Sequence, residues 1–254
     1  MIYEDLNGKR VLVTGSSSGI GAATAKAFAR QGSFVGVHFF RTQRGGEETL
    51  EQVKLYSDGI LLRADMRDEE QVNSMVELFA EKAGGIDILV NNAGTLIARF
   101  DFEDAPVEYH DDIFATNTKS VFLATKAALG YLKKSRGNII NIGSLGAFTG
   151  GGGGSGIYAG AKAAVQAETV AMAAEFAKYH IRVNCVVPGL IETRFHEQFS
   201  TEERKRQIAE KTPVGRNGRP EDIANAILFL ASEEAAGFIN GAYLAVNGGL
   251  NMRT

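Results

Sequence analysis

Seven short apolar runs recur along the chain, separated by stretches in which apolar residues repeat at helical spacing. The runs occupy residues 11–14, 34–39, 60–62, 86–90, 139–142, 181–187 and 242–246. Continuous apolar runs of this length are typical of strands buried on both faces, and their alternation with helices favours a parallel sheet joined by right-handed crossovers. We therefore expect an α/β fold, with a doubly wound, seven-stranded parallel sheet and helices on both of its faces.

The chain has no internal boundary that would divide it. A length of 254 residues fits one large α/β domain or two small ones, but no Pro/Ser-rich linker or block of like charge interrupts it. This pattern predicts a single domain over residues 1–254. The five consecutive glycines at 150–154 are too short for an interdomain linker. They predict a mobile loop at the carboxyl edge of the sheet, where open α/β sheets bind their ligands.

Composition and charge narrow the class of partner. Hydrophobic residues make up 44% of the chain, and a formal net charge of -3 with interspersed signs gives no basic surface for nucleic acid or membrane. No stretch reaches the roughly 18 apolar residues of a membrane-spanning helix. We expect a cytoplasmic protein that acts on a small molecule and binds no metal. The single cysteine, Cys185, lies within an apolar run and is expected to be a buried structural thiol.

The first apolar run leads into a glycine-rich turn and then a helix, expected over residues 22–31. Gly15, Gly19 and Gly21 follow the spacing G-x-x-x-G-x-G rather than the commoner G-x-G-x-x-G. Glycines allow a ligand to approach the backbone closely, and the start of a helix presents unpaired N–H groups with a partial positive charge. The turn therefore predicts a pyrophosphate site, with a plain Gly/Ser connector as the alternative.

Four further motifs follow the later apolar runs. They are Asn-Asn-Ala-Gly at 91–94, Asn117, Ser144, and a tyrosine and lysine four residues apart, Tyr158 and Lys162. Together with the glycine turn, these motifs resemble the short-chain dehydrogenase/reductase family over residues 6–249. The ending Val-Asn-Gly-Gly at 246–249 is similar to that of its 3-oxoacyl-(acyl-carrier-protein) reductases and of its sugar or alcohol dehydrogenases. The resemblance implies a single Rossmann domain that transfers hydride between nicotinamide and a carbonyl or alcohol.

The tyrosine and lysine would carry the chemistry. Residues four apart on a helix share a face, so Tyr158 and Lys162 project together. A phenol with a pKa of about 10 is a poor base, and we expect the ammonium of Lys162 and a positively charged nicotinamide to lower that pKa. Tyr158 would then donate a proton to the carbonyl oxygen during reduction, with Ser144 hydrogen-bonded to the same oxygen. The resemblance implies that Lys162 also holds the nicotinamide ribose and that Asn117 positions a water in a proton relay.

The resemblance further implies the residues that would hold a dinucleotide. Asp65, just before Met66, would accept a hydrogen bond from the adenine amine, and Asn91 would brace the central strands. Thr193 would contact the nicotinamide carboxamide, although a plain helix cap is the alternative for this residue. The full expected set is Gly15, Ser17, Ser18, Gly19, Ile20, Gly21, Phe39, Arg41, Asp65, Met66, Asn91, Ala93, Gly94, Tyr158, Lys162, Pro188, Gly189, Ile191 and Thr193.

The end of the second run bears on which nicotinamide cofactor is used. NAD-preferring folds place an acid about 20 residues beyond the glycine loop, where it accepts both ribose hydroxyls. Phe39 holds that position here, and residues 22–46 contain no acid. His38, Arg41 and Arg44 are expected where a 2′-phosphate would sit, and a guanidinium binds phosphate with paired hydrogen bonds. We expect NADP, with NAD as the alternative.

Substrate and assembly are less constrained by the sequence. Ser144 and Tyr158 are fourteen residues apart, about one more than is usual in the family, and the surplus is placed in 150–154. Residues 190–216 are expected to form a mobile lid over the substrate. The substrate is either a 3-oxoacyl thioester or a sugar, polyol or other small alcohol. Both remain open, because the positions that align with the family's docking arginines are Ser135 and Tyr179, neither of which is basic.

The alanine-rich helix at 158–179 predicts a subunit interface, and the resemblance implies a homotetramer. The competing hypothesis is a dinucleotide-binding redox sensor without catalysis.

Overall fold

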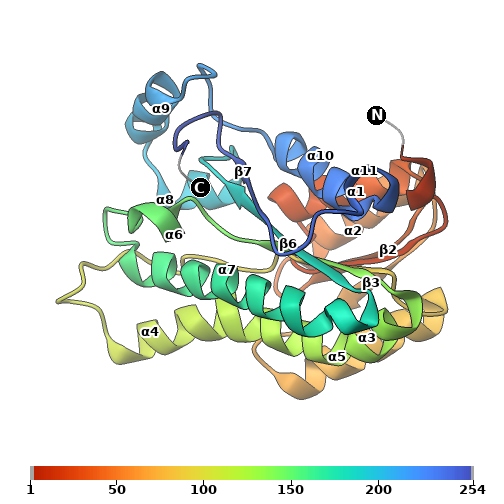
Figure 1. The fold of residues 1–254 in the computed structure, drawn as a ribbon. Helices are drawn as coiled ribbons and strands as arrows, with labels where there is room; N and C mark the ends of the chain where they lie inside the picture. The colour runs from red at the N-terminus through yellow and green to blue at the C-terminus, as the bar shows by residue number, and fades with distance from the viewer. Residues whose placement is uncertain (1–2, 253–254) are drawn as a thin grey trace.

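A computed structural model describes residues 3–252 of the chain, and its centre is a seven-stranded sheet in which every pairing is parallel (Figure 1). The spatial order is β3-β2-β1-β4-β5-β6-β7. The strands are β1 Arg10–Val13, β2 Phe34–Phe39, β3 Gly59–Arg63, β4 Ile88–Asn91, β5 Asn138–Ile142, β6 Arg182–Pro188 and β7 Tyr243–Val246. Each predicted strand is confirmed, with ends that differ by at most two residues.

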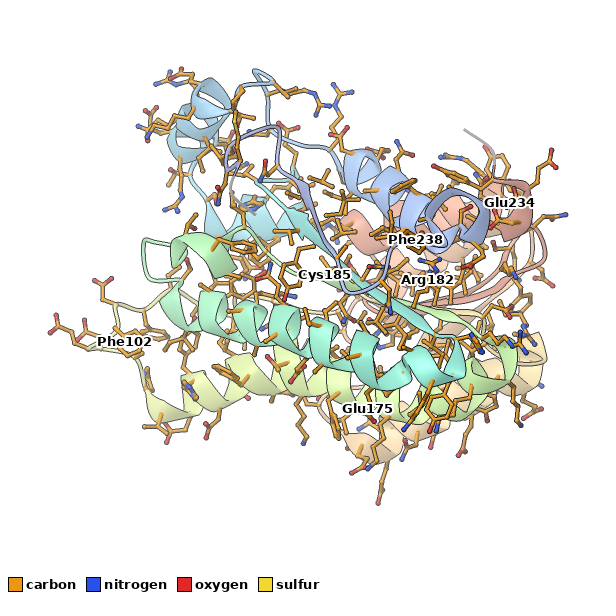
Figure 2. The ribbon with its side chains drawn as sticks, in the orientation of Figure 1. Phe102, Glu175, Arg182, Cys185, Glu234 and Phe238 are labelled. Carbon is orange, nitrogen blue, oxygen red and sulfur yellow. The ribbon has the colours of Figure 1, made fainter. Side chains whose placement is uncertain are left out.

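Helices cover both faces of the sheet, as predicted. One face carries α1 Gly19–Arg30, α2 Gln43–Lys54, α10 Pro220–Ala231 and α11 Glu233–Ala236, and the other carries α3 Glu69–Ala83, α5 Ser120–Ser135 and α7 Gly156–Phe176 (Figure 1). Successive side chains on a strand point to opposite faces, so Val11 and Val13 pack with α1 whereas Leu12 packs with α3 and α5. Cys185, on β6, is fully buried within the sheet, as expected (Figure 2).

The remaining elements are short helices and turns. They are α4 Val107–Phe114, the π-helical turn η2 Ala115–Lys119, α6 Gly146–Thr149, α8 Arg194–Phe199 and α9 Glu202–Lys211, and two single 3-10 turns, η1 Glu4–Leu6 and η3 Ala177–Tyr179. The segment expected as one lid thus contains two helices. No helix within residues 3–252 combines the length and the apolar character needed to cross a bilayer.

The strand order places the site. The chain moves outward from β1 to β3 and then returns to form β4 on the other side of β1. The connections after β1 and β4 therefore leave in opposite directions and open a crevice at the carboxyl ends of these two strands.

Candidate active site

A cleft of about 870 Å³ lies at the carboxyl ends of the strands and contains most of the predicted site. Of the expected catalytic residues, Ser144, Tyr158 and Lys162 line it. The expected cofactor residues that line it are Gly15, Ser17, Ser18, Gly19, Ile20, Phe39, Arg41, Asp65, Met66, Ala93, Gly94, Tyr158, Lys162, Pro188, Gly189, Ile191 and Thr193. Three predicted residues, Gly21, Asn91 and Asn117, are absent from the lining and lie behind it.

The glycine turn presents an open helix start to this cleft. Helix α1 begins at Gly19; Ser18 makes no side-chain cap, and the first turn has no acid. Gly15 has φ +64, and a Cβ built there would lie 2.9 Å from the Cα of Ala93. A Cβ on Gly21 would overlap the carbonyl oxygen of Gly15. The glycines are therefore required by close backbone packing as well as by any ligand, and the uncapped N–H groups suit an anion.

His38 fastens the turn to the neighbouring strands, which corrects its predicted role. Its Nδ1 accepts a hydrogen bond from the backbone N–H of Gly15 at 2.8 Å, and its Nε2 lies 3.0 Å from the carbonyl oxygen of Ala64, to which it donates. The side chain is 2% exposed, and burial lowers its pKa. With both ring nitrogens engaged and the imidazole neutral, His38 is not available to a 2′-phosphate.

Arg44 also departs from the predicted phosphate cluster. Its guanidinium pairs with Glu48 one turn later on α2 at 2.9 Å, its side chain is 90% exposed, and it does not line the cleft. Arg41 does line the cleft and lies with its guanidinium carbon 5.5 Å from the ring centroid of Phe40. Of the three predicted residues, only Arg41 is therefore placed to meet a phosphate.

Two asparagines at the end of β4 hold the floor of the cleft. The amide of Asn91 donates to Asn141 Oδ1 at 2.9 Å and to Thr125 Oγ1 at 3.1 Å, which links β4 to β5 and α5. The amide of Asn92 donates to the carbonyl oxygens of Thr14 and Gly15 at 2.8 and 3.0 Å. Asn91 thus lies beneath the cleft as a brace, whereas Asn92, a member of the same motif to which the sequence assigned no role, shapes the glycine turn.

Asp65 has a partner that the sequence did not reveal. Arg67, two residues later, donates to both carboxylate oxygens, with Nη2 2.7 Å from Oδ2. The hydrogen bonds from the Arg67 side chain are the main reason that the pKa of Asp65 is lowered. A bidentate pair of this kind fixes the carboxylate at the cleft wall as an ionised acceptor.

Tyr158 and Lys162 lie on one face of α7, as their spacing predicts. Lys162 is 3% exposed and donates from Nζ to the carbonyl oxygen of Ile142 at 2.8 Å. Burial lowers the pKa of Lys162 to about 8. Burial also raises the pKa of Tyr158 to about 12, against a smaller opposing effect of a hydrogen bond with Ser144. The pKa of Tyr158 is raised here rather than lowered, because desolvation dominates and Nζ of Lys162 lies 6.0 Å from the phenol ring centroid.

Asn117 lies in the π-helical turn η2 between α4 and α5. Its amide donates to the carbonyl oxygens of Thr95 and Ile113 at 2.8 and 2.9 Å, and its Oδ1 accepts from the N–H of Thr95 at 3.0 Å. A Cβ on Gly94 would lie 2.6 Å from Asn117 Oδ1 and 3.2 Å from Lys162 Nζ. Asn117 and Lys162 thus flank the same glycine, and the widened turn is the kind of local irregularity that often marks a functional position.

The outer wall of the cleft is the lid. Phe195, on α8, lies with its ring centroid 5.8 Å from that of Tyr158. Thr193 precedes α8 without making a side-chain cap, and its Cγ2 would lie 3.2 Å from a Cβ built on Gly19. The helix-cap alternative for Thr193 is thus not what the structure has. The lid brings the Thr193 methyl group to the glycine turn from the opposite side of the cleft, while its hydroxyl donates to the carbonyl oxygen of Ile191 at 3.3 Å.

Comparison with known proteins agrees with this geometry. The family model described as enoyl-(acyl carrier protein) reductase matches residues 15–251. Among curated relatives, the 3-oxoacyl-(acyl-carrier-protein) reductase FabG of Vibrio cholerae serotype O1 is 39% identical over 253 residues, which cover 98% of this chain and 99% of that protein.

Solved structures match equally well. One is a crystal structure of the NADH-dependent reductase A1-R′ responsible for alginate metabolism, with TM-score 0.90 and 36% identity over 98% of this chain and 99% of that one. Another is a short-chain dehydrogenase from Burkholderia cenocepacia J2315 in complex with NADP, with TM-score 0.90 and 31% identity over 97% and 99%. These matches extend over the whole fold and the cleft.

Proposed function

We propose a specific activity from the premise that this chain belongs to the short-chain dehydrogenase/reductase family and is an oxidoreductase acting on carbonyl or CH–OH groups with NAD(P). The proposed activity is NADP(H)-dependent hydride transfer between nicotinamide and a carbonyl or secondary alcohol. The observation that carries it is the partly buried Tyr158, whose phenol lines the cleft beside Ser144 and one helical turn from Lys162.

The raised pKa of Tyr158 suits it to act as a general acid. With a pKa of about 12 the phenol is neutral near pH 7 and holds a proton that it can donate to a carbonyl oxygen. Ser144 donates a hydrogen bond to the same oxygen and so stabilises the charge that develops there. Lys162, whose ammonium is already oriented by the carbonyl of Ile142, would hold the ribose hydroxyls, and Asn117 would position the water that returns a proton.

The residues present fit a nicotinamide dinucleotide, which would supply the hydride. The uncapped start of α1 suits its pyrophosphate, and the carboxylate of Asp65 stands ready as an acceptor at the adenine end. Ala93 and Gly94 line the cleft between these two ends, where their small size leaves room for a ligand above the backbone. Thr193 and Ile191 close the nicotinamide end from the lid side.

NADP is favoured over NAD by the end of β2. Phe39 lines the cleft where an acid would otherwise repel a 2′-phosphate, and Arg41 lies two residues further on. Helix α2 adds to this, because it begins at Gln43 with no side-chain cap from Thr42 and no acid in its first turn. Its N-terminus approaches the glycine turn, since a Cβ on Gly45 would lie 2.5 Å from the carbonyl oxygen of Ser17. An uncapped helix start beside an arginine favours a phosphate.

The cofactor assignment predicts opposite effects of two substitutions. Arg41→Ala removes one charged hydrogen-bond partner and should weaken NADP binding by ~1 to 3 kcal/mol while leaving NAD binding almost unchanged. Phe39→Asp should reverse the preference. Fluorescence titration with both cofactors measures these affinities, and Arg44→Ala, outside the cleft, is the matched control. A wild-type protein that binds NAD more tightly than NADP would overturn the assignment.

The catalytic assignment is tested by Tyr158→Phe, which keeps the ring and removes only the transferable proton. We expect kcat on a panel of ketones, sugars and acyl thioesters, followed by nicotinamide absorbance, to fall by about 10² to 10⁴. Cofactor affinity should remain within about twofold. A redox sensor without catalysis would also keep its cofactor affinity, but its wild-type form would show no turnover on the panel. Tyr56→Phe, on an exposed tyrosine outside the cleft, is the control. Full activity of Tyr158→Phe would assign the proton donor to another residue.

A 3-oxoacyl thioester is one candidate substrate, because a relative that is 39% identical is named a 3-oxoacyl-(acyl-carrier-protein) reductase. The two positions aligned with the docking arginines do not favour it: Ser135 donates its hydroxyl to the carbonyl of Ile86, and Tyr179 lies under Lys133. A small keto or hydroxy compound is the second candidate. The same substrate panel separates the two.

A further inference from the structure

Two arginines meet at the mouth of the cleft, above the five-glycine loop. A Cβ built on Gly153 would lie 2.8 Å from Nη1 of Arg204, on α9, and 3.7 Å from Nη1 of Arg99, on the segment after β4. Both side chains line the same cleft as Tyr158 and Ser144. The two guanidinium groups therefore lie close together at the substrate end, away from the strands that would hold the cofactor's adenosine.

Hydrogen bonds within the protein account for the position of the Arg99 side chain. It donates from Nε to the carbonyl oxygen of Phe199 at 2.9 Å and from Nη1 to the carbonyl oxygens of Gly152 and Gly153 at 3.2 and 2.5 Å. These bonds join the lid to the glycine loop. The acceptors are neutral, so they leave the charge of Arg99 without a counter-ion.

The position of the Arg204 side chain is not accounted for by hydrogen bonds of this kind. Within residues 3–252 its guanidinium donates no hydrogen bond and forms no ion pair, although it is only partly exposed. Its neighbours on α9 behave differently, since Lys205 pairs with Glu202 at 2.5 Å and Arg206 pairs with Glu203 at 2.6 Å. Arg204 alone is turned toward the cleft and toward another cation.

The surrounding groups are also cationic or neutral. Burial, followed by the charge of Arg204, lowers the pKa of Arg99. Burial, followed by the charges of Arg99, Lys205 and Arg204, lowers the pKa of His196 to about 4, so this histidine is neutral near pH 7. Arg194 adds a further exposed cation to the lining. Two like charges held together without an acid are unfavourable, and an anion placed between them would relieve the repulsion.

We propose that the substrate carries a carboxylate in addition to its reacting carbonyl, and that Arg204, with Arg99, binds this carboxylate at the mouth of the cleft. A planar guanidinium matches a carboxylate with two parallel hydrogen bonds, and a desolvated site strengthens them. This inference rests on the proposed function, because the same cleft holds the catalytic tyrosine. It names the substrate class that the family assignment leaves open.

The test compares each keto acid with its uncharged ester. The probes are acetoacetate with ethyl acetoacetate and 4-oxopentanoate with methyl 4-oxopentanoate, together with dihydroxyacetone and its phosphate. In the wild-type protein we expect kcat/KM for at least one acid to exceed that for its ester tenfold or more. Arg204→Gln should lower this acid-to-ester ratio by 10- to 100-fold. Arg206→Gln, a charge change of the same kind on the same helix but outside the cleft, should leave the ratio unchanged.

The opposite results are equally clear. Acid-to-ester ratios near one in the wild-type protein, or an unchanged ratio in Arg204→Gln, would overturn the proposal. A preference confined to dihydroxyacetone phosphate over dihydroxyacetone would overturn the carboxylate assignment and point to a phosphorylated substrate.

Calorimetric titration separates this proposal from the function on which it rests. Acids and esters are titrated into the protein loaded with the oxidised dinucleotide, which has no hydride to donate, so that binding is measured without turnover. Tighter binding of an acid, lost in Arg204→Gln, would support the carboxylate site even if no carbonyl were reduced. Reduction of acids and esters alike, with equal binding, would support the oxidoreductase and reject the carboxylate site. If neither acid binds, the carboxylate site is rejected.

Discussion

At the scale of single residues, one physical cause moves the pKa values of two titratable groups of α7, Tyr158 and Lys162, in opposite directions. Burial disfavours the charged form of each, so the pKa of the Tyr158 phenol rises to about 12 while the pKa of the Lys162 ammonium falls to about 8. Near pH 7 the phenol is neutral and the lysine is still mostly charged. This is the protonation state that the proposed carbonyl reduction requires of the pair.

The lowered pKa of Lys162 predicts an alkaline limit. As pH rises through about 8, the ammonium loses its proton and its charge-assisted hydrogen bonds, so kcat/KM for the cofactor should fall. This parameter reports groups in the free enzyme, which makes a pH profile the appropriate measurement. Lys162→Arg keeps its charge to higher pH, so its activity, although lower overall, should show no decline near pH 8. A decline at the same pH in Lys162→Arg would assign it to another group.

Residue identities were easier to predict than residue partners. The sequence placed Ser144, Tyr158 and Lys162 at one cleft, because one follows a predicted strand and the other two share a face of the next helix. It placed His38 wrongly, because a lone histidine near the end of a strand gives no sign that Gly15 and Ala64 will use both its nitrogens. Arg204 stands within a charged helical stretch, where its pairing state depends on the path of two distant loops.

At the scale of elements, strands were predictable and irregular turns were not. A continuous apolar run identifies a buried strand in the sequence, so β2 was located with correct ends. The π-helical turn η2 has no comparable signal, because the run 107–135 reads as ordinary helix in sequence. The lid divides into α8 and α9 for the same reason: short helices depend on their contacts rather than on a periodic pattern.

The glycine run allows a test of backbone conformation alone. All five residues at 150–154 have positive φ, and Gly150, at φ +72, has no atom within 4 Å of a built Cβ. Gly150→Ala should therefore destabilise the protein by ~1 to 2 kcal/mol through strain without a clash. Gly130→Ala, on α5 with the same open space but helical backbone, should stabilise it by ~0.5 to 1 kcal/mol. Urea unfolding measures both, and equal signs would contradict this reading.

At the scale of the whole molecule, α7 leaves a small-residue face uncovered. The face includes Ala167, Val170, Ala171 and Ala174, of which Val170 is 46% exposed. The predicted homotetramer would cover this face together with α5, on which Phe122 is 54% exposed. The apolar side chains elsewhere, such as Phe102 at a loop tip and Phe238 after α11, stand apart from one another (Figure 2).

This arrangement predicts an assembly mutant. Val170→Arg would place a charge within the α7 face and should shift the protein to smaller oligomers, with a lower mass in light-scattering measurements after size-exclusion chromatography. Leu55→Arg introduces the same charge at an exposed apolar residue at the end of α2, on the other side of the sheet, and should leave the mass unchanged. An unchanged mass in Val170→Arg would place the interface elsewhere.

The hydrogen bonds of His38 have a consequence for the order of events during turnover. Because His38 joins the glycine turn after β1 to the chain after β3, the adenosine half of the cleft is assembled before any ligand arrives. The other half is closed by two helices that a single arginine attaches to a loop made only of glycine. A ligand that binds the adenosine half meets a preformed surface. A ligand that binds the other half must first order the lid helices that enclose it. Kinetically, this asymmetry favours a compulsory sequence, with the dinucleotide first to arrive and last to depart.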